Sequence, residues 1–249
     1  MSRVKPIQMF LLGTGLVLAA ATTHAAGLDS QGNTDGVLTW RLGQLVPNQS
    51  AREVVIFAHA GSHNDLLSLL ESARNEFRQS ANSEAGSNGG GTADQWIANA
   101  STDFCLDENG TFFWEGNRQS LKCVRGGQLS RFAYSLHYND GMDKRAVASI
   151  TRRGSLENLR IGKPVRATGE KALSGLLETA DGRLQVRIRA RMGDGAVAAV
   201  EFKLSNTGHE PLDDVRLTAY SNLEANHDHQ NDYSVLDPEA GGLLTIDPP

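Results

Sequence analysis

The chain lacks the motifs that mark most enzyme active sites. It contains no Gly-x-Ser-x-Gly nucleophile elbow, no Cys-x-x-Cys pair, no His-Glu-x-x-His zinc motif and no P-loop. A chain with 29 Asp and Glu residues always offers pairs of carboxylates, so a pair for glycoside hydrolysis cannot be chosen from the sequence. The missing motifs therefore favour a non-catalytic role.

Clusters of basic residues are also missing. Lys and Arg number 24 against 29 Asp and Glu, which gives a net charge of −5. The most basic stretch, residues 144–153, has its charges on either side of an alternating apolar segment, as at a solvated strand end. We expect no nucleic-acid partner, because binding to phosphates requires clustered Lys and Arg.

Long apolar runs are missing except at the N-terminus. Residues 9–21 carry no charge, follow the positive charges of Arg3 and Lys5, and precede small residues that end at Ala25. This layout is typical of a cleavable secretory signal. A membrane-spanning helix, the alternative, requires about 20 apolar residues, more than this run provides. We therefore expect residues 1–25 to be removed, which changes the net charge from −5 to −7. The mature protein would be periplasmic or secreted, without a transmembrane segment.

The chain has only two cysteines, Cys105 and Cys123. In an exported protein an even number of cysteines indicates a disulfide. The segment between them predicts a three-stranded meander, because an Asn-Gly hairpin signal at residues 109–110 separates the first cysteine from strand-like residues 112–114 and 121–124. The two cysteines would then approach beside the middle strand, and their bond would add about 3 kcal/mol of stability. Two buried free thiols are the alternative.

Most of the chain consists of short alternating segments separated by turns rich in Gly and Asp. In residues 184–192 (LQVRIRARM) we predict Val186, Ile188 and Ala190 inward, with the intervening arginines on a solvated sheet face. Binding of an anionic polymer by this arginine stripe is the alternative. The same pattern predicts strands at residues 37–42, 51–58, 132–138, 146–151, 173–178, 184–192, 197–205, 215–221 and 243–246.

One segment has the periodicity of a helix. Ser62 and Asp65 have the spacing of a capping box, and residues 64–79 are predicted to form a helix that packs on a sheet. Its apolar stripe at helical spacing consists of Leu66, Leu70, Ala73 and Phe77. Residues 79–102 are small, polar and rich in glycine, which predicts a flexible surface insertion. We therefore predict that residues 26–249 form a single all-β domain, an antiparallel β-sandwich with one packed α-helix.

Two stretches resemble known sequence patterns. Residues 200–217 (VEFKLSNTGHEPLDDVRL) are similar to the NTG-x-x-P-x-x-x-V hairpin of bacterial surface immunoglobulin-like modules. Residues 37–55, which include Trp40 and Pro47, resemble the W-x-L-G-x-L-x-P-G segment near the end of such modules, with Asn48 in place of the usual glycine. These motifs describe strands and turns, so the resemblance implies a fold and no activity.

The same stretches also resemble the β-supersandwich domain that precedes the catalytic barrel of glucoamylase-like glycosidases. The similarity extends to residues 233–244 and to the helical residues 62–77. In both families the NTG hairpin comes first, whereas here it follows the Trp-Leu-Gly strand. We therefore expect the strands near residues 37 and 54 to pair with strands downstream. The helical barrel that carries catalysis in the glycosidases has no place in this length, so no catalytic residue is transferred.

Candidate ligand-binding residues are the aromatics Trp96, Trp114 and Tyr233, because aromatic rings stack on sugars and anchor protein interfaces. Structural roles are the alternative, with Trp114 in the core beneath the disulfide and Tyr233 closing a strand.

Residues 224–232 (EANHDHQND) are the one cluster with metal-binding character. His227 and His229 would face the same way on an extended chain, and Asp232 or Glu224 would supply a carboxylate ligand. A solvent-exposed polar loop is the alternative.

The leading functional prediction is an exported, non-catalytic β-sandwich module without a cofactor, which binds a glycan or a cell-envelope protein. Two other hypotheses stay open. One is a carbohydrate-active enzyme or its accessory domain, as the glycosidase resemblance implies. The other is an enzyme that uses a divalent metal held by the His227 cluster.

Overall fold

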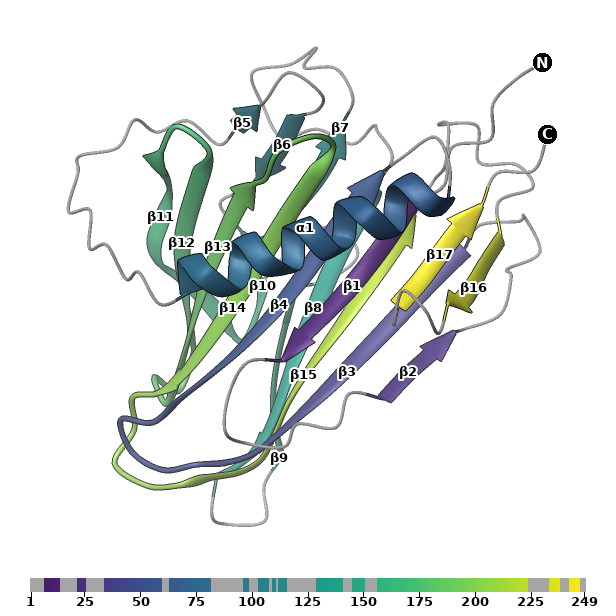
Figure 1. Cartoon of the computed structure of the whole chain (residues 1–249). Helices are drawn as coiled ribbons and strands as arrows, with labels where there is room; N and C mark the ends of the chain where they lie inside the picture. Colours follow the sequence, from purple (N-terminus) through teal and green to yellow (C-terminus); the bar gives the residue numbers. More distant parts are fainter. Residues whose placement is uncertain are drawn as a thin grey trace.

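The described residues of the protein form two antiparallel β-sheets and one α-helix (Figure 1). This fold is seen in a computed structural model, which confirms the predicted sandwich with one packed helix. The structure describes residues 7–13, 22–25, 34–59, 63–81, 96–98, 103–107, 109–110, 112–115, 129–140, 145–150, 156–223, 233–237 and 242–246.

The first sheet, called sheet A, has eight strands. In spatial order they are β11 (Leu159–Gly169), β12 (Ala172–Thr179), β13 (Leu184–Met192), β14 (Val197–Asn206), β4 (Ser50–His59), β1 (Ile7–Gly13), β17 (Gly242–Ile246) and β16 (Tyr233–Asp237).

The second sheet, called sheet B, has nine strands. Along its main path they are β2 (Thr22–Ala25), β3 (Thr34–Leu45), β15 (Leu212–Leu223), β8 (Leu129–Asn139), β7 (Phe112–Glu115), β6 (Asp103–Leu106) and β5 (Trp96–Ala98). Strand β9 (Arg145–Ile150) also pairs with β8, and β10 (Leu156–Glu157) pairs with β9.

An apolar core fills the space between the two sheets. Every second residue of β13 is buried, as predicted, and the inward side chains of β4, β12 and β14 join the same cluster. Tyr134 of β8 meets Phe202 of β14 edge to face, with ring centroids 5.3 Å apart. Full burial of such side chains contributes about 1.5–3 kcal/mol each. The contact therefore holds sheet A to sheet B near the middle of the sandwich.

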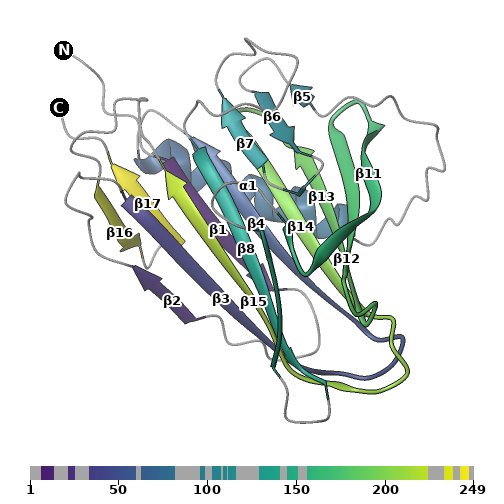
Figure 2. The same ribbon diagram turned by 180° about the vertical axis from the view of Figure 1, so that it is seen from behind.

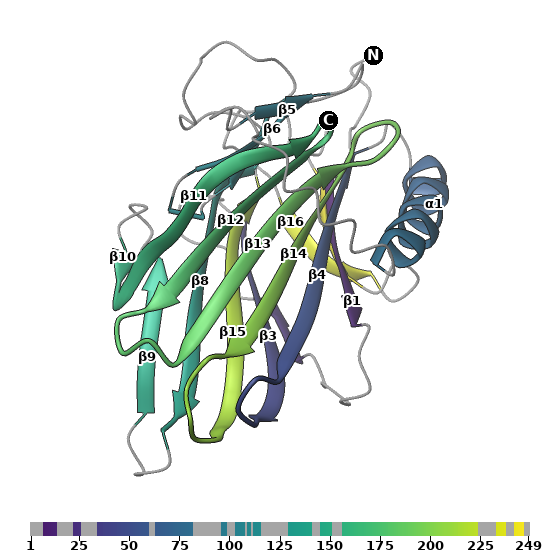
Figure 3. The ribbon, with the colours of Figure 1, turned by 90° about the vertical axis from the view of Figure 1, so that its left-hand side faces the viewer.

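The helix α1 (His63–Ala81) crosses the outer face of sheet A (Figures 1 and 3). It confirms the predicted helix and extends slightly beyond it at both ends. The predicted apolar stripe is at most 4% exposed, and it packs on outward residues of β4 and β14: Val54, Ile56, Ala58, Val197 and Ala199. The opposite face of the molecule, formed by β3, β15 and β8, has no such helix among the described residues (Figure 2).

Two connections cross from one sheet to the other and lie side by side, and we call them the two arches (Figure 1). The first joins β3 to β4 and the second joins β14 to β15, so each links sheet B with sheet A. Asn206 is 1% exposed, and its side-chain amide donates to the carbonyls of Leu45 at 2.7 Å and Glu210 at 2.8 Å. Its backbone pairs with Asn48 and Gln49 of the other arch. One side chain therefore fastens both arches together.

Both motifs lie at the arches, where the strand pairing confirms one expectation and corrects another. The predicted strands near residues 37 and 54 do pair with downstream strands, since β3 pairs with β15 and β4 with β14. The Asn-Thr-Gly turn, however, does not close a hairpin. Its two strands belong to different sheets, because Asn206 bonds across to the first arch and directs the chain away from β14.

Several strands lie where the pattern did not predict them. β11 contains Gly162 and Pro164, which are unfavourable in a central strand. It lies at the edge of sheet A, where proline is tolerated. β5 falls inside the predicted insertion 79–102. β1 and β2 fall inside the predicted export signal, and β1 pairs with both β4 and β17. Cleavage after Ala25 stays a prediction.

Candidate functional site

The outer face of sheet A carries a group of cationic residues between helix α1 and the arches. They alternate along the strands with side chains of the inter-sheet core, so they project outward. We call this group the basic face: Arg52, Arg160, Lys163, Arg166, Arg187, Arg189, Arg191 and Lys203. The acidic residues at outward positions of the same strands are Glu178 and Glu201, so a chain of net negative charge presents a positive surface here.

One row of the basic face consists of cations on neighbouring strands, and we call it the cationic row. Arg187 of β13 pairs in register with Lys203 of β14, which pairs with Arg52 of β4. In the other direction Arg187 pairs with Leu176 of β12, and Leu176 pairs with Lys163 of β11. No acidic residue occupies this row on these five strands. Neighbouring strands lie about 4.8 Å apart, and like charges placed directly opposite cost up to about 1 kcal/mol per pair.

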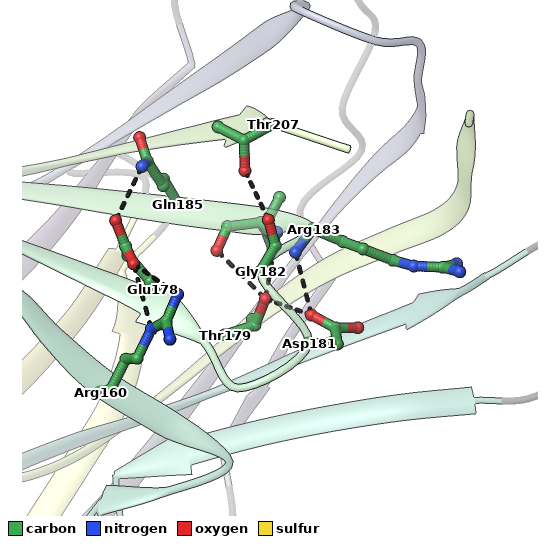
Figure 4. A network of polar contacts seen from close by, with 9 residues as sticks. Arg160, Glu178, Thr179, Asp181, Gly182, Arg183, Gln185 and Thr207 are labelled. Atoms are coloured by element: carbon green, nitrogen blue, oxygen red, sulfur yellow. Dashed lines mark hydrogen bonds and ion pairs between the residues drawn. The ribbon is translucent and has the colours of Figure 1, made fainter. Parts of the chain in front are cut away.

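The two acidic residues border the cationic row, and each is engaged in an ion pair. Glu201, with a side chain 8% exposed, lies 3.6 Å from Nε of Arg52. Glu178 accepts hydrogen bonds from Nε of Arg160 at 3.1 Å and from the amide of Gln185 at 2.9 Å (Figure 4). The pair between Glu201 and Arg52 offsets part of the repulsion at one end of the row. The residues opposite Arg187 on the two neighbouring strands are Leu176 and Lys203, so no carboxylate faces Arg187 in register.

Arg191 marks the border between the basic face and helix α1. Its guanidinium carbon lies 5.2 Å from the ring centroid of Phe77, within the range of a cation–π contact. Burial, and next the positive charge of Arg189, lower the pKa of Arg191 from its ordinary value, while Glu201 and Glu76 act in the opposite direction. An arginine remains charged in spite of such a shift. The cations of this face are therefore close enough to disfavour one another's charge.

The turn between β12 and β13 holds these strands in register (Figure 4). Asp181 accepts hydrogen bonds from the hydroxyl of Thr179 at 2.6 Å, the backbone N–H of Arg183 at 3.0 Å and the hydroxyl of Tyr138 in sheet B at 2.8 Å. Burial opposes the ionisation of Asp181, but these hydrogen bonds outweigh it and lower the pKa of the carboxyl. Gly182 has φ of +73°, a conformation that favours glycine. The position of Arg187 relative to β12 is thus set by a turn tied to the other sheet.

The outer face of sheet B has a different chemistry. Thr39, Thr218, Ser135 and Ser149 occupy one register row across β3, β15, β8 and β9, and we call it the hydroxyl row. The hydroxyl oxygens of Thr39 and Thr218 lie 3.2 Å apart, and Ser149 donates to Glu157 at 3.3 Å. The hydroxyl of Ser135 lies 3.3 Å from Nε2 of His137. Hydroxyls both donate and accept, so the residues of this row find neutral or acidic partners within the sheet.

A shallow pocket lies beside the hydroxyl row, lined by His137, Tyr138, Asn139, Asp214 and Arg216. Asp214 sits at a bulge of β15 with φ of +50°, and it accepts hydrogen bonds from Nε and Nη2 of Arg216 at 2.8 and 2.6 Å. Arg216 pairs in register with Arg41 of β3. The bulge therefore places a carboxylate against an arginine that faces a second cation.

A carboxyl group is buried between the two faces. Glu53 of β4 is 3% exposed, and its Oε2 has no hydrogen-bond partner. It is the register neighbour of Phe202 on β14. Burial raises the pKa of Glu53 to about 7. This residue adds no charge to either outer face, and it makes the core sensitive to pH.

The structure places some of the predicted site residues and leaves others outside the described part of the chain. Trp96 pairs with Cys105 across β5 and β6, and Trp114 pairs with Phe104 across β6 and β7. Tyr233 lies on β16 at the edge of sheet A, so the three aromatics do not share one sheet. Glu224, His227, His229 and Asp232 lie outside the described residues.

The predicted cysteine meander is described in part. β6 and β7 form the expected hairpin, in which the backbone N–H of Gly110 donates to the carbonyl of Asp107 at 2.8 Å. Cys105 is fully buried on β6, while Cys123 lies outside the described residues. The disulfide between Cys105 and Cys123 stays a prediction. Within the described ranges, no group of three or more His, Cys, Asp or Glu residues is arranged to hold a metal ion.

The sequence predicts only part of the basic face. Local alternation identifies the arginines of residues 184–192 as an outward stripe, but it does not show that Lys203 and Arg52 lie beside them. The signal that was needed is the strand order β13-β14-β4, which local alternation does not contain.

No protein-family model, curated protein or solved structure matches this chain. The described segments include no helix with the length and apolar character of a membrane span.

Proposed function

We propose that the protein is an exported, non-catalytic β-sandwich module that binds an acidic glycan through the basic face of sheet A. One observation carries the proposal, namely that Arg187, Lys203 and Arg52 lie opposite one another on three adjacent strands. Three cations at one register position on adjacent strands form a line of positive charge, and such a line attracts an anionic partner. An anion bound across the row would contact cations from all three strands.

The chemistry of the row fits carboxylate or sulfate groups on an extended partner. Arginine presents a planar fork of N–H donors that matches such groups, and lysine adds a point charge. The face is an open sheet surface, so a chain can lie along it without entering a deep pocket. The predicted export would bring the protein to polysaccharides of the cell envelope or the surroundings, and the resemblance to a glycosidase accessory domain agrees with a glycan partner.

The test compares two exposed arginines on opposite faces of the sandwich. Arg187→Gln removes the centre of the cationic row, whereas Arg41→Gln removes one exposed arginine from sheet B. Binding to polygalacturonate, measured by calorimetry at low salt, should weaken up to about fivefold for Arg187→Gln, because an exposed charge contact is worth about 1 kcal/mol or less. Arg41→Gln should bind like the unaltered protein. Equal weakening by both variants would show a general effect of net charge and contradict the proposal.

A further inference from the structure

We infer that the ligand of the basic face is a linear polyanion with one negative charge per sugar unit, and that it lies across the strands of sheet A. This inference rests on the proposed function and adds the direction of the ligand and the spacing of its charges. It comes from the cationic row, in which neighbouring strands place one residue after another at a regular distance.

The cationic row has a definite direction on the sheet. The cations of the row come from different strands, so the line that joins them runs perpendicular to the strands. A ligand parallel to the strands would meet Gln185, Arg187, Arg189 and Arg191 on β13, but on β14 it would meet Glu201 and Ala199 beside Lys203. Only the crossing direction meets cations on β13, β14 and β4 without an acidic residue in the path.

The row also has a regular spacing. Adjacent strands in a sheet lie about 4.8 Å apart, so the row from β11 to β4 covers four steps, or about 19 Å. A hexuronate unit in an extended chain has a length comparable to one strand step. Successive carboxylates of an extended two-fold polyuronate point to opposite sides of the chain, so every second carboxylate faces the sheet. These alternate carboxylates would meet Lys163, Arg187 and Arg52, which lie two strands apart along the row.

Leu176 interrupts the cationic row between Lys163 and Arg187. Its side chain is half-buried and lies at an outward position of β12. The C–H surface of a sugar ring can pack on such an apolar side chain, whereas a phosphodiester chain offers little apolar surface. We assign Leu176 the role of contacting one sugar unit of the bound chain.

Two other polyanions fit the row less well. Single-stranded nucleic acids bind proteins largely by stacking bases on aromatic rings, and the outward positions of β11, β12, β13 and β14 hold no aromatic residue in the described structure. An acidic protein segment has irregular charge spacing, so it would not profit from the regular register of the row. Both ligands are outcomes that the experiment below can reveal.

The test measures the affinity of the full chain for oligogalacturonates of two to seven units and for their methyl esters, by calorimetry at low salt. Affinity should rise with each added unit until about five units cover the row from β4 to β11, and then level off. The increase should be up to about fivefold for each unit that meets a cation. The uncharged methyl esters should not bind measurably.

Two substitutions at one position separate this inference from the proposed function. Leu176→Glu places a negative charge in the row without removing a cation, and Leu176→Gln is the neutral control. The Glu variant should bind the pentamer up to about fivefold more weakly than the Gln variant, and circular dichroism should show that both are folded.

The pattern of failures is informative. If Arg187→Gln weakens binding but affinity does not depend on chain length and Leu176→Glu has no effect, the crossing arrangement is wrong and the proposed function stands. Tighter binding of acidic peptides or single-stranded DNA than of the pentamer would overturn the inference as well. If no oligogalacturonate or polygalacturonate binds at all, both proposals fail together.

Discussion

The two outer faces of the sandwich are built on the same alternation of side chains, but one carries a row of neutral hydroxyls and the other a row of cations. In sheet B the hydroxyls of Thr39 and Thr218 lie 3.2 Å apart and satisfy one another. In sheet A one register row carries Arg187, Lys203 and Arg52, three charges of the same sign. Sheet B also places two arginines opposite each other, and Asp214 binds one of them, as Glu201 binds Arg52 in sheet A. The hydroxyl row of sheet B is neutral and supports the fold, whereas the cationic row of sheet A carries positive charge that attracts an anionic partner.

The largest effect on stability is expected for Glu53, which is buried between the two sheets and belongs to neither outer face. Because burial raises the pKa of Glu53 from 4.5 to about 7, the folded protein disfavours its carboxylate. The resulting penalty is absent below pH 4.5 and complete above pH 7, where it amounts to about 3 kcal/mol. Glu53→Gln should therefore raise the free energy of unfolding at pH 8 and remove its decline between pH 5 and 7. Chemical denaturation across this pH range provides the measurement.

The control for Glu53 is Glu201→Gln, which alters a carboxylate that is ion-paired on the basic face. It should leave the decline between pH 5 and 7 in place. An unchanged decline in Glu53→Gln would show that another group is responsible.

The second effect concerns the side chain that joins the two sheets. Asn206→Ala removes three side-chain hydrogen bonds, two donated to the carbonyls of Leu45 and Glu210 and one accepted from the backbone N–H of Gly208, which should cost about 2 kcal/mol. Gln44→Ala removes one exposed hydrogen bond to Asp213 and should cost less than about 0.5 kcal/mol. Urea titrations of both variants give the comparison. A loss in Asn206→Ala no larger than that in Gln44→Ala would mean that the arches are not fastened by this residue.

The third effect tests the comparison of the two faces directly. Arg187→Thr removes an exposed cation that lies opposite Lys203 in the cationic row, and it should stabilise the protein by up to about 1 kcal/mol at low salt. The gain should shrink at 1 M salt, where the Debye length is about 3 Å. The reciprocal change, Thr218→Lys, breaks the hydroxyl row and should destabilise the protein at both salt concentrations. Thermal unfolding at two salt concentrations distinguishes these responses, and a destabilised Arg187→Thr would contradict repulsion within the row.

The smallest effect is expected at the pocket of sheet B. The side chains of Arg216 and Asp214 are 31% and 38% exposed, so solvent screens their ion pair. Asp214→Asn should lower the free energy of unfolding by less than about 1 kcal/mol. It should leave polygalacturonate binding unchanged, because the change lies on the other face. Weaker polyanion binding by Asp214→Asn would place the ligand on sheet B instead.

Local patterns predicted the elements well, and the reasons are visible in particular segments. Residues 184–192 match β13 because one face of that strand is buried and the other is wet. The helix was found because its stripe packs on β4 and β14. β11 was missed because its glycine, proline and irregular register belong to an edge strand. An apolar run such as residues 7–13 suits both an export signal and a strand, and the intact mass of exported protein decides whether β1 is retained.

The candidate site could not be predicted in the same way, because it depends on which strands are neighbours. Alternation shows that Arg187 points outward, but it does not show that Lys203 and Arg52 stand beside it. Those residues meet through strands far apart in the chain. The Asn-Thr-Gly turn has the same limitation, since its local chemistry predicts a change of direction and leaves open which sheet receives the next strand.

The two arches also govern when the protein can fold. The amide of Asn206 and the carbonyl of Leu45 are 161 positions apart, and Thr39 and Thr218 are 179 apart. Closing a loop of that size costs about 4–5 kcal/mol of chain entropy before any contact is gained, and all-β proteins dominated by such distant pairings fold slowly. During synthesis β3 and β4 emerge before their partners β15 and β14. The contacts between the two arches therefore cannot form until those later strands have been made.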